Sequence, residues 1–119
     1  MQDFRKLAVW QKAQHLTLEV YRVTRGFPKD ELYGMTSQIR RAAASVPTNI
    51  AEGCGRRSDA DFARFLSIAM GSASELDYLI VLSRDLNLMN ARSADALAGS
   101  ATELKRMLAS LIRKIEADN

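Results

Sequence analysis

Apolar residues recur at helical spacing in four separate stretches of the chain. In the first, from Leu7 to Arg25, they step alternately by four and three residues and comprise Val9, Ala13, Leu16, Val20 and Val23. Side chains at this spacing lie along one face of a helix. Gly26 and Pro28 then end the pattern, because glycine suits the position after a helix end and proline cannot continue the helix. We therefore predict a first helix over residues 7–25.

The second stretch, from Glu31 to Glu52, contains a proline. Its apolar stripe consists of Leu32, Met35, Ile39, Ala42, Val46 and Ile50. Pro47 removes one backbone hydrogen bond and crowds the carbonyl of Ala43, which costs about 3 kcal/mol where nothing relaxes. Two outcomes are open: a continuous helix with a kink, or a break followed by a short helix. We favour the kinked helix.

The third stretch begins at a clear capping signal. Ser58 is a typical N-cap, and Asp59 and Asp61 in the first turn complement the helix dipole. The stripe that follows is Phe62, Leu66, Ala69, Ala73, Leu76 and Ile80, and we expect the helix to reach Leu86. Gly71 lies in its centre, where glycine costs about 1 kcal/mol relative to alanine. Close packing of a neighbouring backbone is the expected reason for it.

The fourth stretch follows a turn over 87–90, with Asn90 or Ser93 as its cap. Its apolar residues step by three and four to the end of the chain: Ala94, Leu97, Ala101, Leu104, Leu108, Leu111 and Ile115. Four helices joined by short loops predict an all-α protein, an antiparallel up-down-up-down four-helix bundle whose second helix is kinked at Pro47. We expect one domain over residues 1–119.

Composition agrees with this class and limits where the protein works. Of 119 residues, 47% are hydrophobic and 26% charged, as in soluble globular proteins. The first ten residues lack the long apolar segment of a signal peptide, and no uncharged apolar run approaches the roughly 18 residues of a membrane helix. Cys54 is the single cysteine, which suits a reducing compartment. We expect a cytoplasmic protein without a membrane partner.

The inventory of reactive side chains argues against catalysis. His15 is the one histidine and falls among the polar positions of the first helix, so we expect it in solvent. Cys54 precedes Arg56 and Arg57, whose charges could lower its thiol pKa, but no histidine is nearby in the sequence to act as a base. One histidine and one cysteine cannot form a metal cluster, and there is no Glu-x-x-His pair for a di-iron centre. We expect no catalytic residue, no metal and no cofactor.

Five arginines surround the proline and the loop after the second helix. Arg40 and Arg41 precede Pro47, and the loop and the third helix contribute Arg56, Arg57 and Arg64. The net charge of +3 and the pI near 9.3 permit nucleic-acid binding without requiring it. One interpretation is a phosphate-binding patch, since guanidinium forks suit phosphate oxygens. The other is a set of structural ion pairs, with Glu52 and Glu75 as candidate partners.

A second apolar set lies beside the main stripe of the first helix. It includes Trp10, Leu18 and Tyr21 and makes the apolar arc wider than a bundle core requires. These side chains are either half-buried residues at the edge of the core or part of a subunit interface, where aromatic residues are favoured. Both interpretations stay open.

Two central motifs resemble the signature of the 23S rRNA intervening-sequence protein family. They are Ser37-Gln38-Ile39-Arg40-Arg41-Ala42-Ala43 and Ser45-Val46-Pro47-Thr48-Asn49-Ile50-Ala51-Glu52-Gly53, and the opening over 4–13 is also similar. The resemblance implies a bacterial four-helix bundle that assembles as a ring-shaped homopentamer. A related protein, the accessory variability determinant of diversity-generating retroelements, is a basic pentamer that binds nucleic acid and a reverse transcriptase.

Two functional hypotheses follow from the residues and the resemblance together. The first is a non-enzymatic homo-oligomer that binds nucleic acid, structured RNA in particular, through Arg40, Arg41, Arg56, Arg57 and Arg64. The second is a protein-interaction scaffold whose ring docks another protein and whose arginines form structural ion pairs.

Overall fold

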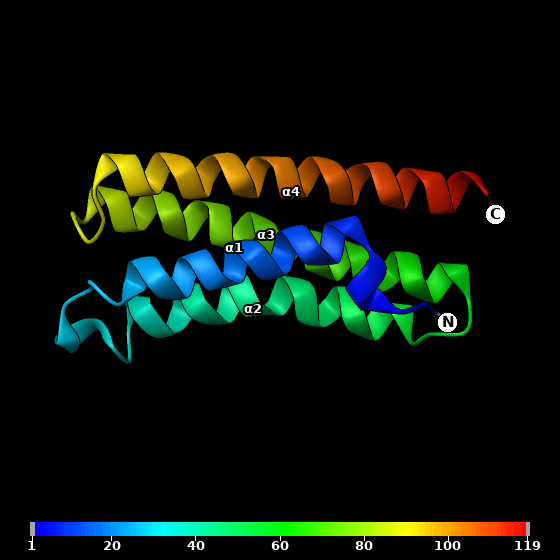
Figure 1. Cartoon of the computed structure of the whole chain (residues 1–119), viewed down its shortest axis with the longest axis horizontal. Helices are drawn as coiled ribbons and strands as arrows, with labels where there is room; N and C mark the ends of the chain where they lie inside the picture. The colour runs from blue at the N-terminus through cyan, green and yellow to red at the C-terminus, as the bar shows by residue number, and fades with distance from the viewer. Residues whose placement is uncertain (1, 119) are drawn as a thin grey trace.

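The computed structural model describes residues 2–118 and arranges them in four long antiparallel helices (Figure 1). Their bounds are Ala8–Thr24 for α1, Met35–Cys54 for α2, Asp59–Asp85 for α3 and Ala91–Ala117 for α4. Short 3₁₀ helices, η1 (Phe4–Lys6) and η2 (Lys29–Glu31), precede α1 and α2. Each helix packs directly against the two helices beside it, and within this range the backbones of the diagonal pairs, α1 with α3 and α2 with α4, stay more than 8 Å apart between Cα atoms. The predicted up-down-up-down bundle is confirmed.

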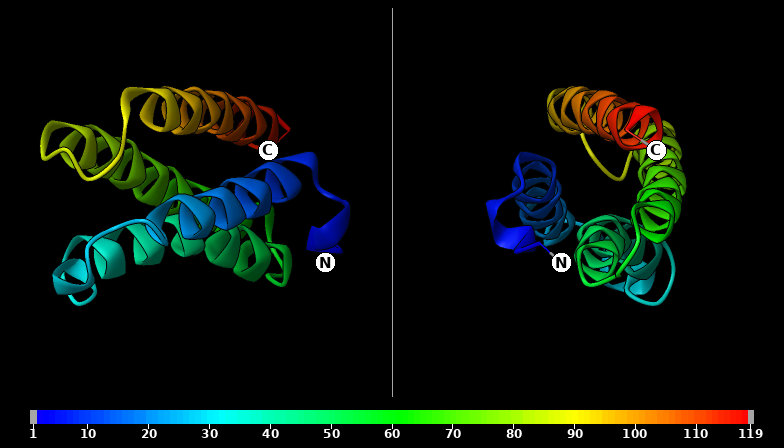
Figure 2. Two further views of the ribbon diagram at one scale, coloured as in Figure 1. Left: turned by 60° about the vertical axis from the view of Figure 1, so that its left-hand side comes forward. Right: turned by 90° about the vertical axis from the view of Figure 1, so that its right-hand side faces the viewer.

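The helices follow one another around the axis of an elongated bundle, as the end-on view shows (Figure 2, right). The bundle measures 46 × 22 × 20 Å. Both chain ends and the α2–α3 loop lie at one end, and the other two loops lie at the opposite end (Figure 1). Residues of the α2–α3 loop are therefore far from the α1–α2 loop.

The predicted stripes form the core, apart from Leu32, which is 48% exposed in the turn before α2, and Val23 and Leu111, which are half-buried. Their side chains point inward from all four helices, and the largest fully buried ones are Leu16, Val20, Ile39, Val46, Ile50, Leu66, Leu76, Ile80, Leu104 and Leu108. Burying a side chain of this size stabilises the fold by about 1.5 to 3 kcal/mol relative to exposure. The spacing of apolar residues thus identified the inward face of every helix.

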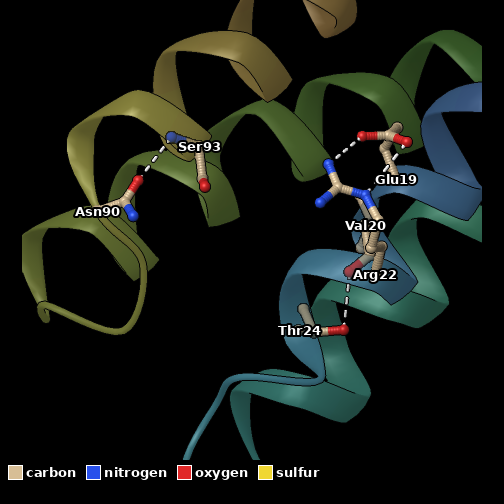
Figure 3. A network of polar contacts seen from close by, with 6 residues as sticks. All are labelled: Glu19, Val20, Arg22, Thr24, Asn90 and Ser93. Carbon is tan, nitrogen blue, oxygen red and sulfur yellow. Dashed lines mark hydrogen bonds and ion pairs between the residues drawn. The ribbon is translucent and has the colours of Figure 1, made fainter.

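Local capping signals were also predicted correctly. Ser58 Oγ accepts a hydrogen bond from the amide of Asp61 at 3.1 Å, and Asn90 Oδ1 accepts one from the amide of Ser93 at 2.8 Å (Figure 3). Each cap satisfies an amide that has no partner within its own helix.

The second helix begins later than predicted. Instead of starting at Glu31, the chain forms η2 and a turn, and α2 begins at Met35. Gly34 has φ −112° and ψ −111°, which is not helical, and interrupts the pattern. The Glu31 carboxylate then accepts a hydrogen bond from the amide of Met35 at 3.0 Å, which caps α2 from outside the helix.

Pro47 does not break α2, because another helix satisfies the carbonyl that the proline leaves free. The helix runs without interruption from Met35 to Cys54. Without an N–H, Pro47 cannot donate to the carbonyl of Ala43. The buried hydroxyl of Thr17 on α1 shares its one hydrogen between that carbonyl, at 3.1 Å, and the carbonyl of Ala13, at 2.8 Å. The continuous helix is confirmed, and the α1–α2 contact compensates for the proline.

Two glycines have opposite surroundings, and the prediction for one of them was wrong. A Cβ at Gly71 would meet nothing within 4 Å, because this residue faces outward from α3. Close packing inside the chain therefore does not explain Gly71. A Cβ at Gly53 would lie 2.9 Å from Cδ1 of Phe62 and 3.0 Å from Cβ of Phe65. Gly53 is the glycine that allows α2 and α3 to approach.

One helix of the described chain, α3, is long and apolar enough to span a membrane by length and composition. An 18-residue window of α3 has a mean hydropathy of 1.4, and 39% of it is buried inside the bundle. Core helices of bundles pass the same test, since their inner faces are apolar. The outer face of α3 also carries exposed apolar side chains, among them Ile68, Tyr78 and Val81.

Candidate nucleic-acid interface

Three of the five predicted arginines gather at the end of the bundle where α2 meets α3. Arg56 and Arg64 each place a guanidinium carbon over the ring of Phe65, at 4.6 Å from its centroid. Arg57 lies beside them in the loop, and no hydrogen bond or ion pair is formed by its side chain within residues 2–118. We call Arg56, Arg57 and Arg64 the loop arginines.

Acidic groups of the first turn of α3 lie next to the loop arginines. Arg64 Nε is 3.5 Å from Asp61 Oδ1. The side chain of Arg64 is 59% exposed and that of Asp61 is 50% exposed. Asp59 and Arg57 help to line a small cavity of about 60 Å³ beside Gly53. These carboxylates lower the local positive potential but leave Arg57 without a carboxylate partner among the described residues.

Arg40 lies elsewhere and is held by α1. Its Nε donates to Thr24 Oγ1 at 2.8 Å, and its guanidinium carbon stands 4.5 Å from the centroid of the Tyr21 ring. Thr24 in turn donates its hydroxyl hydrogen to the carbonyl of Val20 at 2.8 Å, close to the surface ion pair of Glu19 with Arg22 (Figure 3). Arg40 is half-buried and joins α2 to α1.

Arg41 points to the opposite neighbour of α2. Its Nη2 lies 2.9 Å from the carboxylate of Glu75 on α3, as the structural interpretation expected for one of the two candidate glutamates. The other candidate, Glu52, forms no ion pair within the described residues. Arg41 and Arg56 are fifteen positions apart, which along a helix is about 22 Å. The five arginines therefore do not form one patch: the loop arginines lie together, whereas Arg40 and Arg41 point to opposite neighbours of α2.

The three predicted interface residues of α1 are differently exposed. Trp10 is half-buried and packs against Phe4, with ring centroids 5.0 Å apart. Leu18 is 57% exposed, and Tyr21 is 40% exposed although Arg40 covers its ring. Within the single chain, Trp10 lies at the edge of the core, whereas Leu18 and Tyr21 are exposed apolar surface.

The single histidine and the single cysteine lie in different environments. His15 is exposed, as predicted. Cys54 is buried at the end of α2, where desolvation by burial, followed by the nearby Asp3, raises the pKa of its thiol. This is the opposite of the shift that neighbouring arginines would cause. The Cys54 thiol is therefore protonated at neutral pH.

Sequence inspection missed one feature, an apolar groove of about 490 Å³ between α1 and the second half of α4. We call it the α1–α4 groove. Its lining residues are Leu7, Ala8, Val9, Glu103, Arg106, Met107, Ser110, Leu111 and Lys114. The only signal was the length difference between α1, with 17 residues, and α4, with 27.

Comparison with known proteins identifies the family of this fold. The family model described as 23S rRNA-intervening sequence protein matches residues 5–110. A crystal structure of a protein of unknown function from the S23 ribosomal protein family of Bacteroides thetaiotaomicron is similar, with a TM-score of 0.80 and 25% identity over 88% of this chain and 98% of that chain. No curated protein sequence matches this chain. The chain belongs to the 23S rRNA-intervening sequence protein family.

Proposed function

We propose that this protein is a non-enzymatic, homo-oligomeric bundle of the cytoplasm that binds structured RNA through its loop arginines. The observation that carries the proposal is the placement of Arg56 and Arg64 on the Phe65 ring, with Arg57 beside them. An arginine stacked on an aromatic ring keeps its N–H groups in the plane of the guanidinium, where they can reach phosphate oxygens. These two stacked arginines and Arg57 put three cations at one end of the bundle, where they suit the phosphate backbone of a folded RNA.

The family supports an RNA ligand and an assembly. Its name links its members to intervening sequences of 23S rRNA. The resemblance of the central motifs implies a ring of five subunits, which would place five copies of the loop arginines around one axis. Repetition of a weak site multiplies affinity when one RNA contacts several copies. This compensates for the small net charge of +3 per chain.

The test measures the affinity of a 23S rRNA hairpin fragment by fluorescence anisotropy at several salt concentrations. The variant Arg56→Ala with Arg57→Ala removes two of the loop arginines. We expect its affinity for the hairpin to fall about tenfold near 0.1 M salt. The slope of log K against log salt should become less steep by about two, because each removed arginine contributes about one to the slope.

A matched control removes two arginines that lie outside the cluster. Arg92→Ala with Arg113→Ala changes the net charge equally, and both side chains are exposed on α4. We expect its affinity for the hairpin to stay within about twofold of the parent. Equal affinity of the parent and the Arg56/Arg57 variant for the hairpin would refute the proposed site. Native mass spectrometry of the same samples gives the number of subunits.

The alternative function, a protein-interaction scaffold, is favoured by the contacts of Arg40 and Arg41. Arg40 donates to Thr24 and Arg41 pairs with Glu75, so both guanidinium groups already have partners on neighbouring helices, as structural contacts would. This hypothesis expects little affinity for RNA at physiological salt. The hairpin measurement separates it from RNA binding, because a scaffold leaves the anisotropy of the labelled hairpin unchanged.

A further inference from the structure

The α1–α4 groove combines an apolar floor with a basic rim. Leu7, Met107 and Leu111 are each half-buried, so part of their apolar surface faces the opening. Contiguous exposed apolar surface rimmed by polar residues marks interaction sites on soluble proteins. The methionine adds an adaptable side chain, which is favoured on surfaces that bind apolar helix faces.

The unpaired charges at the rim are positive. Glu103 is neutralised by Lys12 of α1, beside the groove, whose Nζ lies 2.9 Å from its carboxylate. The other two charged rim residues, Arg106 and Lys114, form no ion pair or side-chain hydrogen bond within residues 2–118. A ligand that covers the floor would therefore meet two cations without carboxylate partners.

The dimensions suit a helix. The α4 wall runs from Glu103 to Lys114, a rise of about 16 Å or three helical turns. The opposite wall is short and consists of Leu7 and the first two residues of α1, Ala8 and Val9. Neither wall contains a strand edge to which an extended peptide could add main-chain hydrogen bonds. An amphipathic helix needs no such edge, because it binds through apolar side chains at positions i, i+3 or i+4, and i+7.

We propose that the α1–α4 groove binds an acidic amphipathic helix of a partner protein. The apolar face of that helix covers Leu7, Met107 and Leu111, and its carboxylates pair with Arg106 and Lys114. Charge complementarity at the rim selects an acidic partner and excludes a basic one. The groove does not include any of the loop arginines, so binding of the partner helix does not depend on the proposed RNA binding.

The test uses a fluorescent helical peptide of about 18 residues with leucines on one face and glutamates on the other. The double variant Arg106→Glu with Lys114→Glu reverses the rim charge. We expect it to bind the glutamate peptide about tenfold more weakly than the parent, and to bind a matched lysine peptide more tightly. The control Arg92→Glu with Arg113→Glu makes the same change in net charge on exposed positions outside the groove, and its affinity should change less than about twofold.

A second variant tests the groove without changing charge. Ser110→Trp places a large ring in the opening and should weaken binding of the glutamate peptide about tenfold by occupying its site. Circular dichroism and sedimentation verify that each variant stays folded and keeps its subunit number. Three results would overturn the proposal: no binding of the glutamate peptide to the parent, equal losses in the rim and control double variants, or dissociation of an oligomer by Ser110→Trp. The last result would mean that a second copy of this chain covers the groove.

Discussion

The two sides of the bundle are held together in different ways. α2 packs closely on its neighbours: Thr17 of α1 completes the hydrogen bonding of the Ala43 carbonyl, and Gly53 lets α3 approach. Between α1 and α4, by contrast, the polar link is the surface ion pair of Lys12 with Glu103, beside an open groove. The close side has buried polar groups and small residues that require one particular partner. On the open side the polar contact is exposed, and the small residues Ala8 and Ser110 line the groove.

This difference indicates where the molecule can bind others. Separating α2 from its neighbours would leave buried polar groups without partners, which costs free energy. A ligand that inserted itself between these helices would therefore bind weakly. The α1–α4 groove is already open, so a ligand can cover its apolar surface without separating any helices. The following variants test whether the two sides differ in stability as their contacts indicate.

The largest effect is expected for Gly53→Ala on the close side. The added methyl group would lie 2.9 Å from Cδ1 of Phe62 and 3.0 Å from Cβ of Phe65, so α2 and α3 must move apart or the rings must shift. Overpacking of this kind costs about 1 to 3 kcal/mol, which the better helix propensity of alanine partly offsets. We expect the free energy of unfolding, measured by urea denaturation, to fall by about 1 to 2 kcal/mol.

Gly71→Ala is the matched control for that substitution. Nothing lies within 4 Å of a Cβ at position 71, so the same chemical change should stabilise α3 through helix propensity alone. We expect the free energy of unfolding to rise by about 0.5 to 1 kcal/mol. A loss of stability in Gly71→Ala that depends on protein concentration would show instead that a second subunit packs against this glycine.

A smaller loss is expected for Thr17→Val, which keeps the shape of the side chain and removes its hydroxyl. The Ala43 carbonyl then loses its donor inside the protein. An unsatisfied buried acceptor costs about 1 kcal/mol or more. We expect urea denaturation to report a loss of this size.

A double-mutant cycle tests the reason for that loss. In the background of Pro47→Ala, the new backbone N–H can donate to the Ala43 carbonyl, so Thr17→Val should cost roughly half as much. Equal costs in both backgrounds would contradict the proposed compensation and assign the effect to the bond between Thr17 and the Ala13 carbonyl.

The sequence predicted the helices well because their signals are local. The apolar stripes and the caps at Ser58 and Asn90 depend on spacings within a few residues, and both caps form as expected. The start of α2 was missed because Leu32 matched the helical stripe, whereas the backbone of Gly34 interrupts the helix. Continuity through Pro47 was predicted, but its partner was not, since Thr17 and Ala43 are 26 positions apart.

The candidate site was only partly predictable for the same reason. Arg56 and Arg64 share the ring of Phe65 because they are close in sequence at one helix junction. Arg40 binds Thr24 of another helix, which no local pattern indicates. Arg41 pairs with Glu75, one of the two glutamates that the sequence offered as partners, but the sequence could not decide between them. The α1–α4 groove depends on the relative lengths and placement of two helices at opposite ends of the chain, so residue spacing could not predict it.

The smallest effect is expected for Lys12→Ala on the open side. Lys12 and Glu103 form a pair beside the groove at 2.9 Å, but the glutamate side chain is 63% exposed. Exposed ion pairs contribute little because water and salt screen them, so the free energy of unfolding should change by less than about 0.5 kcal/mol. The same variant frees Glu103 at the groove rim, where its charge should repel the glutamate peptide and weaken its binding. Weaker peptide binding at unchanged stability would identify the pair as part of the groove's charge pattern, whereas a loss as large as that of Thr17→Val would show that both sides of the bundle are held equally firmly.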